Sequence, residues 1–328
     1  MSAPSLYARM REHGTLTETP KDIPDAVFAL PSTLNWMKAL AILTTELGVD
    51  FQNARTFYQR VQRRDLAEPQ LNSVFEQLLF SLNQLAALRA LTAVPNKADV
   101  ARVGIVTWYY GVYGAASAMI AAADGSFPET HAMTALQWDR QFANPKLAMP
   151  PFADRLSSVK KTDADAELAA PRSRGQYSLT TTPTTLEQAW GCSAEYLSGT
   201  AAWERWNQEQ RVRSSPAFKA LEVEDFRTKA ARELRDAAFV RKSICFLHEA
   251  SRYRGKANYR DAIYLAYGKS VPTLVDGFID DLAIVLSGFS AMAAGYSSVR
   301  MGRDRWAEFM TDLEARRAIS LSPLAVWS

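Results

Sequence analysis

Apolar residues recur every three or four positions along most of the chain, which is the spacing of helices that bury one face. The clearest example begins at Pro69, continues to about Ala93 and is stopped by Pro95. Segments that alternate apolar and polar residues, as strands do, are scarce. The pattern therefore predicts an all-α fold, a multi-helix bundle.

Prolines, glycines and capping residues set the limits of the predicted helices. Gly255 is predicted to break or cap the helix before it. Residues 143–183 contain five prolines among charged and Ser/Thr-rich sequence, so we expect a connector or a partly ordered insertion there. The predicted helices cover residues 23–48, 51–66, 69–93, 99–123, 129–142, a segment from 184 past 206, a long segment opening with acids at 222–225, 239–253, 273–299 and 304–317.

The length of 328 residues is enough for one large or two medium domains. We divide the chain into an N-terminal helical region, a central helical domain that carries the proline-rich insertion, and a C-terminal helix with a tail. The three regions are residues 1–95, 96–300 and 301–328.

Two uncharged runs, 104–123 and 282–299, approach the length needed to cross a membrane. Both are rich in Ala, Gly, Ser and Tyr, and Asp280 and Asp281 abut the second run. We expect two buried core helices in a soluble bundle, with a membrane-associated protein as the less favoured alternative.

The first fourteen residues lack an apolar core, so no signal peptide is predicted. Cys192 and Cys245 stand alone, which suggests neither a disulfide framework nor a zinc site and fits a reducing cytoplasm.

The usual phosphate-loop, dinucleotide, zincin and serine-hydrolase motifs are absent from the sequence. With three histidines in the chain, a histidine-rich metal site is excluded, and no cofactor or metal is predicted; a carboxylate metal site stays open.

Positive charge is concentrated in one block of the chain. Residues 205–260 hold 14 Lys/Arg and 7 Asp/Glu, a net charge of +7, so the rest of a chain whose total is +3 carries −4. A basic block in an otherwise acidic protein favours an anionic partner such as RNA, DNA or a nucleotide. A solvated helix surface is the competing interpretation.

The stretch 239–267 carries the candidate chemistry. On a helix, Arg241, Cys245, His248 and Arg252 would fall within roughly 60° of one another. Guanidinium groups suit phosphate, and an imidazole moves protons near neutral pH, so this face could bind and cleave a phosphodiester without metal. A solvated basic face with a structural histidine is the alternative.

Two segments resemble the HEPN superfamily of all-α toxin, phage-defence and RNA-processing domains. WYYGVYGAASAMIAA, residues 108–122, is similar to the family's Tyr-rich first long helix. YRGKANYRDAIYLAY, residues 253–267, is similar to its Arg-rich turn, and the helix at 273–299 to its long last helix. The matching parts make up about a quarter of the chain.

The resemblance implies a HEPN-like core with an N-terminal helical extension, a homodimer, RNA as ligand, and a toxin–antitoxin or defence-system partner. Catalytic members carry an Arg and a His that are separated by four to six intervening residues. Here Arg252 is followed by Asn258 at the aligned place, and asparagine cannot act as a general base. Arg241 and His248 have the required spacing, although they come before the turn.

Our leading interpretation is an RNA-binding protein with metal-independent ribonuclease chemistry, in which Arg241, His248 and Arg252 are catalytic. The alternative is a non-enzymatic helical protein that binds an acidic partner or a nucleotide. For Tyr109 and Tyr113 the competing interpretation is core packing. The predicted substrate-binding residues are Arg254, Lys256, Asn258, Tyr259, Arg260, Tyr109 and Tyr113.

Overall fold

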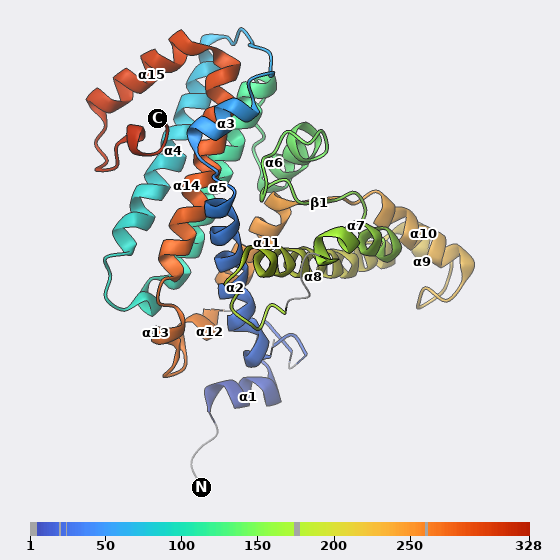
Figure 1. Cartoon of the computed structure of the whole chain (residues 1–328). Coiled ribbons are helices and arrows are strands. Elements are labelled where there is room, and N and C mark those ends of the chain that lie inside the picture. Colours follow the sequence, from blue (N-terminus) through green and yellow to red (C-terminus); the bar gives the residue numbers. More distant parts are fainter. Residues whose placement is uncertain (1–4, 20, 24, 174–177, 260–261) are drawn as a thin grey trace.

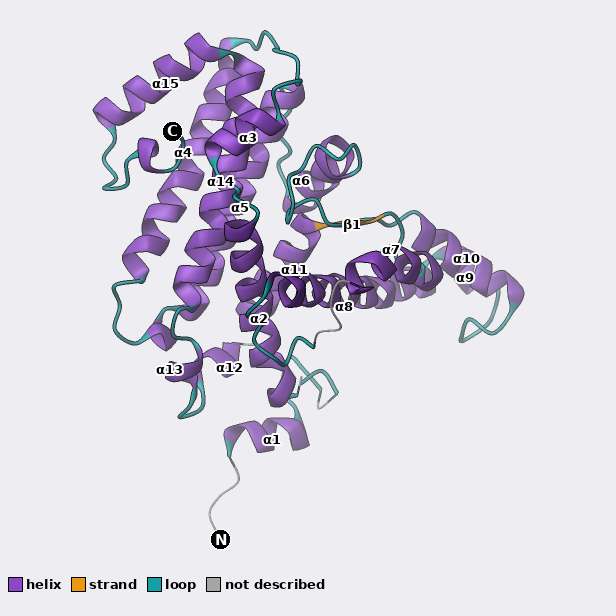
Figure 2. Cartoon of the chain, in the orientation of Figure 1, coloured by secondary structure: helices purple, strands orange, loops and turns teal. Residues whose placement is uncertain are grey.

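The computed structural model describes residues 5–19, 21–23, 25–173, 178–259 and 262–328. Helices dominate this part of the chain, and its only strands are two residues long (Figure 2), so the predicted all-α class is confirmed. The helices are α1 Leu6–His13, α2 Ala26–Glu46, α3 Phe51–Phe57, α4 Glu68–Leu91, α5 Ala101–Asp124, α6 His131–Trp138, α7 Lys161–Ser173, α8 Leu186–Ser214, α9 Pro216–Lys219, α10 Lys229–Val240, α11 Phe246–Tyr259, α12 Ala262–Ala266, α13 Val271–Leu274, α14 Phe278–Met301 and α15 Arg303–Arg316.

Helices α2, α3, α4, α5 and α14 pack into an upright bundle (Figure 1). Its buried apolar side chains form one core that extends from Ala29 to Trp327, so all three regions predicted from the sequence contribute to it. Helices α5 and α14 lie side by side and are buried along most of their length. The prediction that the two uncharged runs are buried core helices is therefore confirmed, and the two helices are neighbours.

Small residues let the helices of this bundle approach closely. A Cβ built on Gly111 of α5 would lie 2.5 Å from a methyl group of Leu286 on α14. On the other side of α14, a Cβ on Gly295 would lie 2.6 Å from the Cβ of Ala54 on α3. The glycine and alanine content of the two runs thus reflects close helix contacts as well as burial.

Two segments are long and apolar enough to cross a membrane by length and composition alone: Val27–Glu46 and Val271–Met301. In the windows that pass this test, 67% and 78% of the residues are buried within the protein. The core helices of soluble proteins pass the same test, and so do signal sequences near an N-terminus. Cytoplasmic localisation therefore stays a prediction.

Helices α7, α8, α9 and α10 extend sideways from the bundle as an arm (Figure 1). The arm has its own small apolar core, which includes Leu156, Leu168, Leu197 and Phe239. Residues 143–183, predicted to be a connector or a partly ordered insertion, contain α7 and the strand β1, Arg155–Leu156. The apolar residues of this segment find their partners on α8 and α10, which its local sequence does not reveal.

Three other helix limits differ from the prediction. The helix that starts at Phe51 ends at Phe57 instead of Leu66. The helix predicted to open with the acidic residues 222–225 starts at Lys229, where the Thr228 side chain caps it. The predicted helix at 273–299 is divided into α13 and α14 by Gly277, whose φ of 76° interrupts the helix.

Replacing Gly295 by alanine should destabilise the protein. The new Cβ would meet the Ala54 Cβ at 2.6 Å and two backbone atoms of α3 at 3.2 Å, and backbone cannot move aside cheaply. Overpacking of this kind costs about 1–3 kcal/mol. Urea unfolding of the variant measures the loss.

Gly255→Ala is the matched control for this substitution. Gly255 lies inside α11 with nothing within 4 Å of a built Cβ, so alanine should stabilise that helix by about 0.5–1 kcal/mol. Equal unfolding midpoints for the two variants would contradict the close packing of α3 against α14.

Candidate functional site

The chain breaks its helical path between α10 and α11. Helix α10 ends at Val240, a turn follows, strand β2 covers Ile244–Cys245, and α11 starts at Phe246. The predicted helix 239–253 was therefore wrong, and Arg241 does not share a helical face with His248 and Arg252. The predicted break at Gly255 was also wrong, because α11 continues through it to Tyr259.

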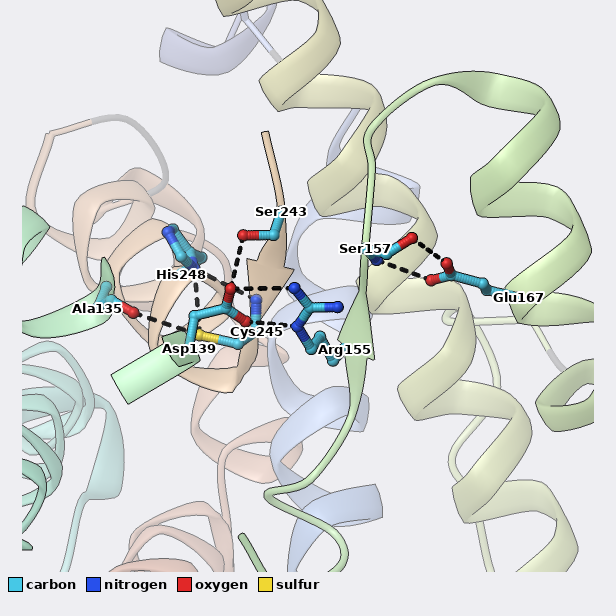
Figure 3. Close-up of polar contacts among 8 residues, drawn as sticks. All are labelled: Ala135, Asp139, Arg155, Ser157, Glu167, Ser243, Cys245 and His248. Carbon is cyan, nitrogen blue, oxygen red and sulfur yellow. Dashed lines mark hydrogen bonds and ion pairs between the residues drawn. The ribbon is translucent and has the colours of Figure 1, made fainter. Parts of the chain in front are cut away.

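A buried ion pair holds this break in place (Figure 3). Asp139, at the start of a π-helical turn after α6, accepts hydrogen bonds from Arg155 of β1 at 2.7 and 3.2 Å. The Ser243 hydroxyl donates to the same carboxylate at 2.7 Å. Strands β1 and β2 pair antiparallel, with Arg155 opposite Cys245. The turn before β2 is thus tied to residues about a hundred positions earlier in the chain.

His248 turns back onto the start of its own helix (Figure 3). Its Nδ1 lies 3.2 Å from the backbone N–H of Cys245, which donates to it, and 3.2 Å from the Cys245 Sγ. The sulfur also lies 3.7 Å from the carbonyl oxygen of Ala135. Because Nδ1 accepts a hydrogen bond, the hydrogen-bond network assigns the proton of the neutral ring to Nε2.

Burial keeps both members of this Cys–His pair neutral. Burial lowers the pKa of His248 to about 4; Lys242 lowers it as well, whereas Asp139 opposes the shift. Burial, reinforced by Asp139, raises the pKa of Cys245 to about 12. A thiolate–imidazolium pair, which a nucleophilic cysteine needs, is therefore disfavoured. At neutral pH the imidazole offers one N–H donor.

A cleft of about 750 Å³ lies where α8, α11 and the first turn of α6 meet. Four cationic side chains line it against two acidic ones, and both His131 and His248 contribute to its wall. Trp203 is the one large aromatic ring in the lining. The charged lining residues are Arg211, Lys242, Arg252, Lys256, Asp22 and Glu204.

Arg252 is oriented within the cleft by α8. Its Nη1 donates to the Thr200 hydroxyl at 3.0 Å, and its guanidinium lies 5.4 Å from the ring centre of Tyr196. Lys242 lies 3.8 Å from the buried carboxylate of Glu204, which also accepts from the Gln208 amide at 2.7 Å. The other acid, Asp22, accepts from the Thr19 hydroxyl at 2.8 Å, so both acids are already engaged with neighbouring groups.

A second group of the predicted residues lies beside the cleft. The Arg254 guanidinium stacks on the Tyr109 ring at 4.8 Å, and Tyr113 packs edge-on to His131 at 4.4 Å. Burial raises the pKa of Tyr109 to about 12 and lowers that of His131 from its ordinary value. His131, which lines the cleft, connects this aromatic cluster to it.

The structure thus brings His248, Arg252 and Lys256 together and separates them from Arg241. Arg241 is exposed at the C-terminal end of α10, where it lines a separate surface hollow. The backbone oxygen of Asn258 accepts a hydrogen bond from Arg102 at 2.8 Å. The side chain of Tyr259 and the whole of Arg260 lie outside the described residues.

Several residues of the cleft were not predicted from the sequence. Thr200, Trp203 and Arg211 come from α8, whose sequence matches no known motif. Their spacing could have indicated a shared site: three residues separate the first two positions and eight the next two, which places all three along the same side of a helix. His131 and Lys242 become part of the site only through tertiary contacts.

Within the described part of the chain, no three His, Cys, Asp or Glu side chains gather closely enough to hold a metal ion. Comparison of the chain with protein-family models, with curated proteins and with solved structures gives no match. The HEPN resemblance, the homodimer and the roles of the site residues therefore stay predictions.

The low pKa of His248 should make stability depend on pH. Its folded pKa of about 4 lies below the ordinary 6.5, so unfolding takes up a proton between these values. The stabilisation is complete above pH 6.5 and is lost as the pH falls toward 4, by ~3 kcal/mol at most. Urea unfolding between pH 7.5 and 4.5 measures the loss.

His248→Gln is the comparison for this experiment, because the glutamine oxygen can still accept from the Cys245 N–H. The variant should lose less stability over the same pH range, since it lacks the titrating ring. Parallel pH profiles for the wild type and the variant would show that His248 titrates normally in the folded protein.

Proposed function

We propose that the protein binds a nucleotide in the cleft between α8 and α11. The observation that carries this proposal is the convergence of Arg252, Lys256 and Arg211 with Trp203 around a space of about 750 Å³. That volume lies in the usual range for small-molecule sites. The cations would hold the phosphate, and Trp203 would stack on the base.

The orientation of Arg252 supports the phosphate part of this proposal. Thr200 and Tyr196 fix the guanidinium before any ligand arrives, so little side-chain freedom is lost on binding. His248 adds a neutral N–H donor from Nε2, which does not depend on pH above about 4. These groups form a set of donors suited to an anion.

The charge state of His248 favours binding over cleavage. A general base or acid works best with a pKa near the working pH, and burial holds this pKa at about 4. Its Nδ1 lone pair is already used by Cys245. Arg241, the second predicted catalytic cation, lies on α10 at a separate hollow.

Lys256→Ala and Arg252→Ala should each weaken the binding of adenosine monophosphate by about 10- to 150-fold, the effect of losing a hydrogen bond to a charged group. Isothermal titration calorimetry measures the affinity. Arg241→Ala is the matched control: it also removes one exposed cation but lies outside the cleft, so its affinity should equal that of the wild type. Equal losses of affinity in all three variants would mean that the substitutions act only through the net charge of the protein.

Metal-independent RNA cleavage is the second candidate function. It is favoured by the placement of His248 and Arg252 one helical turn apart on α11, with both side chains lining the cleft. Once its Nδ1 releases the Cys245 N–H, His248 would take the proton of a 2′-hydroxyl, whose oxygen attacks the phosphorus. The P–O5′ bond would then break, with the leaving oxygen taking a proton from the imidazolium, and Arg252 would stabilise the charge on the phosphorane. The homodimer and the toxin or defence setting belong to this candidate.

For this candidate, the cleavage rate should rise with pH only up to about pH 4, because the base must be deprotonated and its pKa is about 4. His248→Ala should lower the rate by about 10²–10⁴-fold. EDTA should leave the rate unchanged. Full activity in His248→Ala, or loss of cleavage in EDTA, would contradict this role for His248.

A further inference from the structure

Two tryptophans are exposed next to each other on α8. Trp203 is 37% exposed and lines the cleft, and Trp206 is 54% exposed one helical turn further along. Residues three apart on a helix are neighbours on its surface. A second large ring therefore continues the surface that Trp203 begins inside the cleft.

The cleft is longer than a single nucleotide. Its lining on α8 extends from Thr200 to Arg211, two positions that are eleven residues apart and so separated by about 16 Å along the helix. Stacked nucleotides in one strand advance by about 3.4 Å each. Arg211 is exposed at the far end of this lining, beyond the position of Trp206 in the helix.

We infer that the occupant of the cleft is a single-stranded nucleic acid, with one base stacked on Trp203, the next on Trp206, and its phosphates directed to Lys256 and Arg211. This inference rests on the proposed nucleotide site and extends it to a ligand of at least two nucleotides. Stacking platforms beside cationic grooves are the usual means of binding single strands without strong sequence preference.

Charge complementarity favours this occupant over an apolar protein surface. An exposed pair of tryptophans alone would suit many partners, but Trp203 lines the same cleft as Arg211, Lys242, Arg252 and Lys256. The lining carries four cations against two acids: Glu204, which is engaged by Lys242 and Gln208, and Asp22, which accepts from Thr19. The surface that Trp206 extends is therefore one that attracts a polyanion.

The test compares adenosine monophosphate with a single-stranded hexa-adenylate on the full chain, using calorimetry for the first and fluorescence anisotropy of a labelled oligonucleotide for the second. Trp206→Ala should weaken hexa-adenylate binding by about 5- to 150-fold, the loss of one stacked base, and leave binding of the monophosphate unchanged. Trp203→Ala should weaken both. Trp206→Phe, which keeps a ring at this position, should restore most of the oligonucleotide affinity.

The outcomes separate this inference from the proposed function. If the monophosphate binds and Trp206→Ala leaves hexa-adenylate affinity unchanged, the site takes a mononucleotide and the extension is overturned. If the wild type binds neither probe, both proposals fail together. If Trp206→Ala and Trp206→Phe lose the same amount of hexa-adenylate affinity while their circular dichroism is unchanged, stacking at Trp206 is also overturned.

Discussion

The ion pair of Asp139 and Arg155 determines where the candidate site lies in the structure. It joins the end of α6, which packs on the bundle, to β1, which belongs to the arm. Through Ser243 the same carboxylate fixes the turn that separates α10 from α11. A buried charge that loses its partner costs about 3–5 kcal/mol, so these contacts are mutually dependent. The direction of α11, and with it the position of His248 and Arg252, follows from this arrangement.

The same constraint explains the chemistry of His248. Because β2 ends at Cys245, directly before α11, the Cys245 backbone N–H can donate to His248 in the first turn of the helix. That contact places the imidazole in a buried position, and burial lowers its pKa to about 4. A histidine on a continuous, solvent-exposed helix would instead titrate near its ordinary pKa. The fold therefore converts a candidate proton carrier into a fixed hydrogen-bond donor.

Helices with their own boundary signals were predictable from the sequence, and those set by distant contacts were not. The predicted helices 69–93 and 99–123 match α4 and α5 to within about two residues, because prolines, glycines and apolar spacing mark them locally. The break after Arg241 carries no proline or glycine and depends on Asp139. Within the site, the basic residues of α11 were identified from the sequence. The contribution of α8 could not be predicted, because it depends on which helix α8 packs against.

The effective charge of Arg252 depends on a neighbour that the sequence would count as its counter-ion. Glu249 lies three residues earlier on α11 and is 2% exposed. Burial raises the pKa of this carboxyl well above its ordinary value, Asp154 raises it further, and the opposing influence of Arg252 is smaller. The raised pKa makes Glu249 a weaker counter-ion for the guanidinium, which is held at the cleft by the neutral partners Thr200 and Tyr196. The positive charge at Arg252 is thus offset less than the sequence suggests, although a carboxyl group lies three residues earlier in the chain.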